Sequence, residues 1–129
     1  MTQLLDAGER LRGVRVLLVE DEYYIADDFR RTLSAAGASV IASCASVRAA
    51  QKAIEDGNFD VAVLDLNLNG ESGEPLAGAL DARGIPYAIA TGYGPSALSE
   101  GLTAVPWIEK PFEPSLLIEV IGSLAGRPA

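Results

Sequence analysis

Short apolar runs alternate along this chain with segments of helical periodicity, and this alternation limits the fold more than any other feature. The runs have the length and composition of buried strands and lie at 14–19, 39–43, 61–64, 87–90 and 105–108. Strands that alternate with helices form a parallel sheet with right-handed crossovers and helices on both faces. The sequence therefore predicts an α/β fold with five parallel strands.

The helical segments carry start and stop signals of the usual kinds. Apolar residues three and four positions apart predict a helix over 25–36, and two further helices are expected at 46–57 and 75–84, with a last one near the C-terminus. The fourth connection, 92–104, is short and rich in Gly and Pro, so we expect only a short helix at about 95–100. The boundary signals are Ser or Pro at the start and Gly at the end: Gly37, Ser46, Gly57, Pro75, Gly84 and Pro114.

The chain has the length and composition of one folded domain. Its 129 residues fall within the common range for a single core, and an apolar fraction of 49% with 22% charged residues is ordinary for a globular protein. We assign residues 13–125 to this domain and 1–12 to an N-terminal extension that either docks as a short helix or stays loose. No interdomain linker or separate output domain is expected.

Charge and residue usage exclude several classes of function. A net charge of −8 with scattered Lys and Arg disfavours nucleic acid and anionic membranes as partners, and leaves a protein as the expected partner. Histidine is absent, so a Ser-His-Asp site is excluded and any phosphohistidine must come from another chain. The single cysteine, Cys44, follows an apolar stretch and reads as a small buried side chain. No run is long enough to span a membrane, and we expect a cytoplasmic location.

Polar residues of functional types follow four of the five predicted strands. Glu20 and Asp21 follow the first strand, Asp65 the third, Thr91 the fourth and Lys110 the fifth. Because the carboxyl ends of parallel strands share one edge of a sheet, these residues are expected to assemble into one site. Read singly, the acidic pair could serve only as helix-capping or dipole groups, Thr91 as a turn residue and Lys110 as a solvated charge. Glu22, the next residue, is expected to be only a capping or dipole group.

Together these residues predict Mg²⁺-dependent phosphoryl chemistry. Three carboxylates repel one another unless a hard cation lies between them, and Mg²⁺ prefers oxygen ligands. Asp65 then has the environment of a carboxylate nucleophile that forms an acyl phosphate. Lys110 and the Thr91 hydroxyl are placed to bind the transferred phosphoryl oxygens.

The motifs around these residues resemble a known family. They read Val-Glu-Asp-Glu at 19–22, Leu-Asp-Leu-Asn-Leu at 64–68, Ala-Thr-Gly-Tyr at 90–93 and Glu-Lys-Pro-Phe at 109–112. In this order they are similar to the response-regulator receiver domain, over about residues 13–125. The resemblance implies a flavodoxin-like, doubly wound sheet with strand order 2-1-3-4-5, and a single-domain response regulator of a two-component system or phosphorelay.

The resemblance also implies separate roles for the residues of the site. Asp65 is the phosphorylated residue, Thr91 the switch hydroxyl and Lys110 the phosphate partner, joined to Pro111 by a cis peptide bond. The implied Mg²⁺ ligands are Asp21, Asp65 and the backbone carbonyl of Asn67, with Glu20 in the water shell of the metal. Conformational switching is implied for Thr91 together with Trp107 or Tyr93.

A narrower resemblance concerns the expected partner. Residues 86–93 are similar to the Pro-Phe-x-Phe-Ala-Thr-Gly-Tyr signature of stand-alone bacterial receivers, which implies a sensor histidine kinase of the HWE or a related type, or a phosphotransfer protein, as donor. A downstream protein is the implied target. Many receivers place Pro four residues beyond the phosphorylated Asp, whereas this chain has Asn69 and then Gly70, a pair that gives the loop more conformational freedom.

Two other functions remain open from the sequence. A receiver-like scaffold would recognise its partner without being phosphorylated, although all the residues needed for phosphorylation are present. A flavodoxin-like module would bind a flavin phosphate. That function fits poorly, because carboxylates around the site would repel a phosphate group in the absence of a metal. In the leading interpretation the chain phosphorylates and dephosphorylates itself, and is no enzyme in the sense of turning over an external product.

Overall fold

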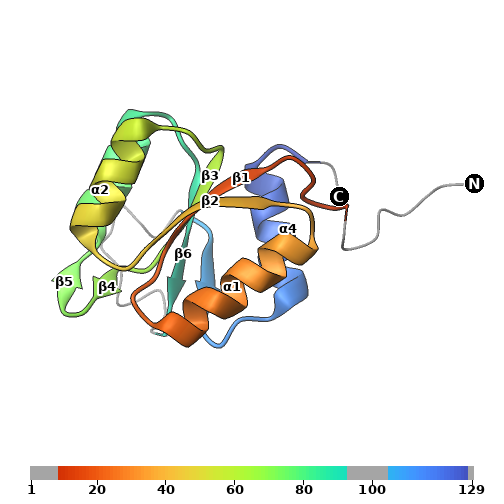
Figure 1. Cartoon of the computed structure of the whole chain (residues 1–129), viewed down its shortest axis with the longest axis horizontal. Helices are drawn as coiled ribbons and strands as arrows, with labels where there is room; N and C mark the ends of the chain where they lie inside the picture. The colour runs from red at the N-terminus through yellow and green to blue at the C-terminus, as the bar shows by residue number, and fades with distance from the viewer. Residues whose placement is uncertain (1–8, 93–104, 128–129) are drawn as a thin grey trace, which may run out of the picture.

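The computed structural model of the chain describes residues 9–92 and 105–127, and its centre is a five-stranded sheet (Figure 1). All neighbouring strands in it are parallel and follow the order β2-β1-β3-β6-β7. When only the five strands of this sheet are numbered along the chain, their order is the predicted 2-1-3-4-5. The predicted α/β fold is therefore confirmed. The strands are β1 (Arg15–Val19), β2 (Ser39–Cys44), β3 (Val61–Leu64), β6 (Tyr87–Thr91) and β7 (Trp107–Glu109).

Helices cover both faces of this sheet. Figure 1 shows α1 (Tyr23–Ala35) and α4 (Pro114–Leu124) on one side and α2 (Val47–Asp56) on the other, where α3 (Glu74–Ala82) also packs. Each face has its own apolar core, and alternate residues of the central strands point into one core or the other. This two-sided burial explains why β3 and β6 are continuous apolar runs.

Local start and stop signals are used as the sequence predicted. The Ser46 hydroxyl accepts a hydrogen bond of 3.1 Å from the backbone N–H of Ala49, and Gly57 ends α2 in the left-handed region at φ 63°. Pro75 lies in the first turn of α3 and Pro114 opens α4. The caps therefore fix the helix boundaries that the hydrophobic pattern leaves open.

The last strand is shorter than its apolar run. It begins at Trp107 and not at Val105, because Pro106 has no N–H and contributes only its carbonyl, which accepts from the Ile89 N–H at 2.9 Å. The short helix predicted at about 95–100 lies outside the residues that the structure describes, and so does Tyr93.

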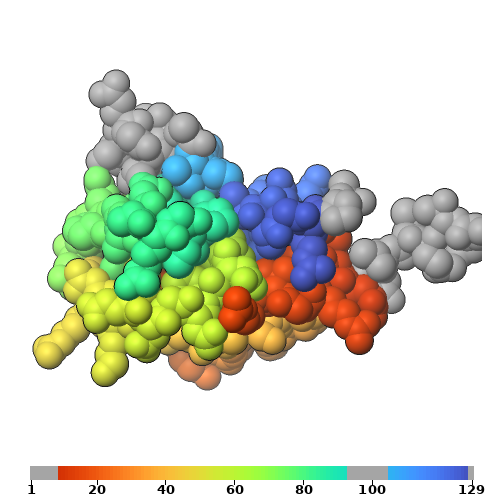
Figure 2. Space-filling view, turned by 90° about the horizontal axis from the view of Figure 1, so that it is seen from above, coloured from red at the N-terminus to blue at the C-terminus, as the bar shows by residue number. Residues whose placement is uncertain are grey.

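The described part of the N-terminal extension packs against the domain. Leu11 is fully buried in the core under α1 and α4, and its N–H donates to the Ala36 carbonyl at 2.7 Å. The Arg10 guanidinium lies against Gly122 of α4. Figure 2 shows the start of the described chain beside the last helix. None of the helices in the described residues has the length and hydropathy needed to cross a bilayer.

A second, two-stranded sheet follows Asp65. Strands β4 (Asn67–Leu68) and β5 (Glu71–Ser72) pair antiparallel, joined by Asn69 at φ 55° and Gly70 at φ 86°. Positive φ at both positions is the conformation of a two-residue type I′ hairpin turn, for which Asn-Gly is the preferred sequence. The sequence analysis interpreted Asn69 and Gly70 as a source of conformational freedom in the loop. They instead form the turn of a regular hairpin, which we call the β4–β5 hairpin.

Candidate functional site

Strand register brings the predicted site residues to one edge of the sheet. Val19 of β1 pairs with Leu64 of β3, so the next residues along each chain segment, Glu20 and Asp65, emerge side by side. One strand further, Thr91 pairs with the residue before Lys110, and its carbonyl accepts from the Lys110 N–H at 2.9 Å. Parallel pairing therefore assembles a site from residues 90 positions apart in sequence.

Three carboxylates meet at this edge. Ligand oxygens of Glu20, Asp21 and Asp65 all lie within 4.8 Å of one another. Glu20 is 2% exposed and Asp65 7% exposed, while Asp21 is partly open to solvent. Carboxylates this close and this buried are costly unless cations balance them.

Lys110 provides one of these cations. Its Nζ atom lies 2.8 Å from Glu20 Oε1 and 3.0 Å from Asp65 Oδ2, and the cis Lys110–Pro111 bond that the resemblance implied is present. The aromatic ring of Phe112 stacks on Phe29 of α1 with ring centroids 4.4 Å apart, which fixes the loop that carries the lysine. The ammonium is thus anchored between the two most buried carboxylates.

The electrostatics follow from this burial and pairing. Burial raises the pKa of Glu20, and the hydrogen bonds from Lys110 and from the Glu22 N–H oppose that rise only in part. Burial by itself would lower the pKa of Lys110, but the hydrogen bonds to Glu20 and Asp65 outweigh it and the net shift is upward. Lys110 therefore stays an ammonium at neutral pH, as a partner for anionic oxygens requires.

Glu22, which reads from the sequence as a capping group, does not cap α1 with its side chain. It occupies the N-cap position without a side-chain hydrogen bond, and its own N–H donates to Glu20 Oε2 at 3.0 Å. The capping part of the prediction was wrong, because the buried carboxylate of Glu20 accepts the backbone N–H at the start of the helix.

The β4–β5 hairpin holds the other two carboxylates. Asp65 Oδ1 accepts from the Asn67 N–H at 3.0 Å, and Asp21 Oδ2 accepts from the Asn69 N–H at 2.9 Å. Asn67 also accepts at its side-chain Oδ1 from the Gly70 N–H at 2.9 Å. The sequence analysis missed these hairpin contacts, although the Asn-Gly dipeptide between short apolar positions is a known hairpin signal.

The donor set fits a hard dication. Every candidate ligand atom is an oxygen, which suits Mg²⁺ and disfavours metals that need thiolate or imidazole ligands. Three carboxylates against one ammonium also leave net negative charge at the site. The residues present therefore match the predicted Mg²⁺ site, with Glu20, Asp21 and Asp65 as its side chains.

The predicted switch residues that the structure describes lie on β6 and β7, the two strands that follow β3 in the sheet. Thr91 is 5% exposed at the end of β6, the central strand that follows β3 in the sheet. Trp107 is half-buried, pairs with Ile89 and packs against the core under α2 and α3. The structure describes one conformation of both residues, so their switching stays a prediction.

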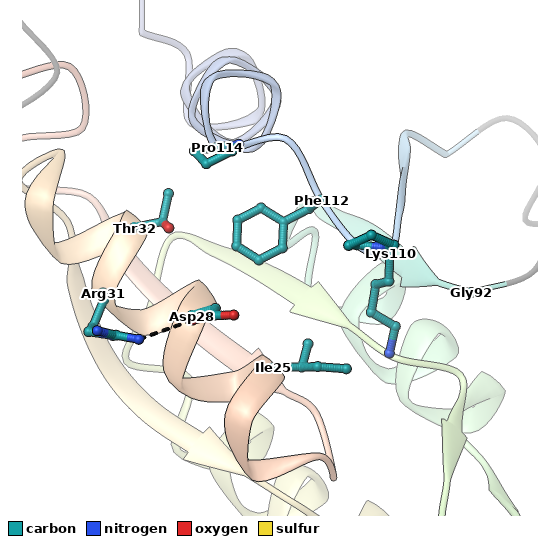
Figure 3. Close-up of a pocket in the computed structure, with 9 residues that line it drawn as sticks. Ile25, Asp28, Arg31, Thr32, Gly92, Lys110, Phe112 and Pro114 are labelled. Atoms are coloured by element: carbon teal, nitrogen blue, oxygen red, sulfur yellow. Dashed lines mark hydrogen bonds and ion pairs between the residues drawn. The ribbon is translucent and has the colours of Figure 1, made fainter.

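A groove of about 580 Å³ opens beside the site. Figure 3 shows it between α1 and the loop into α4, with Ile25 and Thr32 on one wall and Phe112 and Pro114 on the other. Lys110 lines the groove, and its side chain extends out of it toward the end of β3. Lys110 thus belongs both to the lining of the groove and to the carboxylate cluster.

Gly73 is a positioning residue that sequence reasoning did not find. A Cβ atom there would lie 2.6 Å from the backbone oxygen of Asp65, and the Gly73 N–H donates to the Leu66 carbonyl at 2.8 Å. We expect Gly73→Ala to displace the Asp65 backbone and to lower the free energy of unfolding by about 2 kcal/mol. The displaced backbone should also slow the predicted phosphorylation of Asp65. Chemical denaturation and a rate assay on one preparation check both effects.

Gly78 offers the matched control for that substitution. It lies on the exposed side of α3 with no atom near its would-be Cβ, so Gly78→Ala should be neutral or stabilise the protein by up to about 1 kcal/mol. Equal stability of the two alanine variants would contradict the close-approach role of Gly73.

Comparisons with known proteins agree with the fold. The sequence model described as response regulator receiver domain matches residues 16–122. The solution structure of SdrG from Sphingomonas melonis Fr1 is 32% identical, covers 90% of this chain and 98% of that chain, and has a TM-score of 0.78. No curated protein matches the sequence at a significant level.

Two further solved structures are similar. The response regulator PhyR from Brucella abortus is 25% identical with a TM-score of 0.78, and the match covers 93% of this chain and 51% of that chain. The chain thus spans about half the length of that PhyR. A BeF3-activated conformation of SdrG, its source given as Pseudomonas melonis Fr1, is 32% identical, covers 86% of this chain and 95% of that chain, and has a TM-score of 0.75.

Proposed function

This chain belongs to the response regulator receiver domain family, and from that premise we propose that it accepts a phosphoryl group on Asp65 from the phosphohistidine of a sensor kinase or phosphotransfer protein. The observation that carries the proposal is the contact of the Lys110 ammonium with Asp65 inside a cluster of three carboxylates. A nucleophilic carboxylate, its counterion and the acidic groups for a metal lie together at the edge where parallel sheets bind ligands.

The transfer step is a displacement at phosphorus. A carboxylate oxygen of Asp65 forms the new P–O bond while the P–N bond of the phosphohistidine breaks, and the electron pair of that bond returns to the imidazole nitrogen. Lys110 and Thr91 bind the phosphoryl oxygens. Mg²⁺, held by Asp21, Asp65 and the Asn67 carbonyl with Glu20 in its water shell, would supply the charge neutralisation that phosphoryl transfer requires.

The reverse of the signal is hydrolysis. Water attacks the phosphorus atom of the acyl phosphate, the P–O bond to Asp65 breaks, and the carboxylate is restored with release of inorganic phosphate. The chain consumes its own modification in this reaction and turns over no external product. SdrG, a relative of 32% identity, is known in a BeF3-activated conformation, which supports the proposal that this chain also has an activated state.

Phosphorylation then acts as a switch in protein–protein interactions. It biases two conformations of the domain, with Thr91, Trp107 and Tyr93 as the proposed moving residues and a downstream protein as the reader. A cytoplasmic location, where the kinase domain would meet the receiver, stays a prediction. The alternative of a scaffold that works without phosphorylation keeps the same surface but makes no use of the Lys110–Asp65 contact.

The donor is expected to dock on the first turn of α1. Tyr23 and Tyr24 are 71% and 80% exposed there and contact each other edge to face with centroids 5.4 Å apart. In sequence they come two positions after Asp21 of the acidic cluster, and Ile25 beside them lines the groove described above. Exposed tyrosines next to an apolar groove have the composition of an interface centre, and here the acceptor carboxylate adjoins it.

We expect Tyr24→Ala to slow phosphoryl transfer from a kinase about tenfold, the effect of losing an interface residue worth about 1.4 kcal/mol. Phosphorylation by acetyl phosphate should be unchanged, because a small donor needs no docking surface. The measurement is the rate of each reaction on the same preparation. An equal slowing with both donors would contradict the docking role.

The experiment that tests the function is transfer from an autophosphorylated HWE-type histidine kinase. The labelled phosphoryl group should leave the kinase and appear on this chain only when Mg²⁺ is present, and a chelator should stop it. As a control, the kinase should phosphorylate its own cognate receiver in the same buffer. If it does so but transfers no phosphoryl group to this chain, the scaffold alternative is favoured.

A further inference from the structure

The β4–β5 hairpin contacts two carboxylates that come from different strands. Asp65 ends β3 and Asp21 follows β1, yet both accept a backbone N–H from this one turn, at 3.0 Å from Asn67 and 2.9 Å from Asn69. A hydrogen bond of 2.9 Å from the Gly70 N–H to Asn67 Oδ1 connects the tip of the turn to β4. One small element thus contacts two members of the cluster, and at Asp65 it uses the carboxylate oxygen that Lys110 leaves to it.

We propose that the β4–β5 hairpin is a built-in template that fixes the Asp21 and Asp65 carboxylates relative to each other, with Asn69 as the positioning residue for Asp21. This inference rests on the proposed function, since it concerns how the site of that function is made ready for Mg²⁺. No residue of the turn needs to touch the phosphoryl group for this role.

The need for a template comes from charge. Asp21 and Asp65 repel each other. Among the described residues, Lys110 forms ion pairs with Asp65 and Glu20 and none with Asp21. The Asn69 N–H is the hydrogen-bond donor that holds the Asp21 carboxylate on this side. A backbone donor fixed in a turn costs no side-chain entropy, so it holds the anion more firmly than a mobile side chain would.

The hairpin is rigid enough to act as a template. Leu68 is 2% exposed in the core under α2 and α3, which anchors β4 from below. The Gly73 N–H closes the base of the hairpin on the Leu66 carbonyl at 2.8 Å. The hairpin is therefore held at its base and along β4. These anchors fix the position of the turn, and with it the Asn69 N–H that contacts Asp21.

The backbone conformation of the tip explains its sequence. Asn69 at φ 55° and Gly70 at φ 86° both lie in the left-handed region, where Gly is unstrained and Asn is tolerated better than other residues. A residue that cannot adopt this φ would turn the N–H of position 69 away from Asp21. The Asn-Gly pair thus serves the orientation of a backbone group and not a side-chain contact.

The test compares two substitutions at the same position. Asn69→Pro removes the N–H and fixes φ near −65°, whereas Asn69→Gly keeps the N–H and the left-handed conformation. Isothermal titration calorimetry with MgCl₂ should show a dissociation constant about tenfold weaker for Asn69→Pro, as for other lost hydrogen bonds to metal ligands, and within about twofold of wild type for Asn69→Gly.

A third variant covers the case in which Asn69→Pro does not fold. Asn69→Val keeps the backbone N–H but disfavours positive φ, and should weaken Mg²⁺ binding about threefold or more. Wild-type affinity in Asn69→Pro or Asn69→Val would overturn the template role. A wild-type protein that binds no Mg²⁺ would instead overturn the proposed function, so the two failures are distinct.

Discussion

Replacing Asp65 by Asn is expected to abolish phosphoryl acceptance while the fold is kept. The Asn amide oxygen can still accept the N–H of Asn67, and Lys110 keeps its contact with Glu20. An amide is no nucleophile toward phosphorus, and its neutral charge also weakens the metal site. Labelled phosphate transferred from a kinase should therefore be undetectable on the Asp65→Asn variant after a time that saturates wild type.

Circular dichroism and thermal unfolding provide the control for this variant. Because one of three clustered carboxylates becomes neutral, the metal-free protein should be as stable as wild type or slightly more stable. Undiminished labelling of a folded Asp65→Asn protein would contradict the assignment and would direct attention to Asp21 or Glu20 as acceptor.

Replacing Lys110 by Met should lower the free energy of unfolding by about 3 kcal/mol in a chelating buffer. The Glu20 and Asp65 side chains are 1% and 9% exposed, and the substitution removes the ammonium that balances them. Mg²⁺ should restore much of this loss, because a cation bound to the folded state alone stabilises it by mass action. Urea unfolding with and without Mg²⁺ measures the difference.

Lys52 is the matched control, since it is the other lysine of the chain and lies exposed on α2. Lys52→Met should change stability by less than about 0.5 kcal/mol in either buffer. If Lys110→Met lost no more stability than Lys52→Met, or lost the same amount with and without Mg²⁺, the balancing role of Lys110 would be wrong.

The elements that sequence reasoning predicted well are those with local signals. Strand β3 matches its predicted run at 61–64, and α2 begins after Ser46 and ends at Gly57 as expected, because burial on both faces and helix caps leave a direct mark on residue type. The meeting of Glu20, Asp65, Thr91 and Lys110 also followed from local patterns, since parallel strands share their carboxyl edge.

The features that escaped prediction depend on contacts distant in sequence or on competition between neighbours. Gly73 must be Gly because the Asp65 backbone passes 2.6 Å from its would-be Cβ, and nothing within the local sequence announces that approach. The Glu22 side chain does not cap α1, and the Glu22 N–H donates instead to the buried carboxylate of Glu20. The β4–β5 hairpin is different, because Asn69-Gly70 is a hairpin signal that was read only as loop freedom.

The most direct measurement is intact mass spectrometry after incubation with acetyl phosphate, with Mg²⁺ in one sample and a chelator in the other. The expected result is a single added phosphoryl group that requires Mg²⁺, that maps to the peptide containing Asp65, and that is lost on standing as the acyl phosphate hydrolyses. An unmodified mass in both samples, or an adduct of equal yield in the chelator, would contradict Mg²⁺-dependent phosphorylation of Asp65.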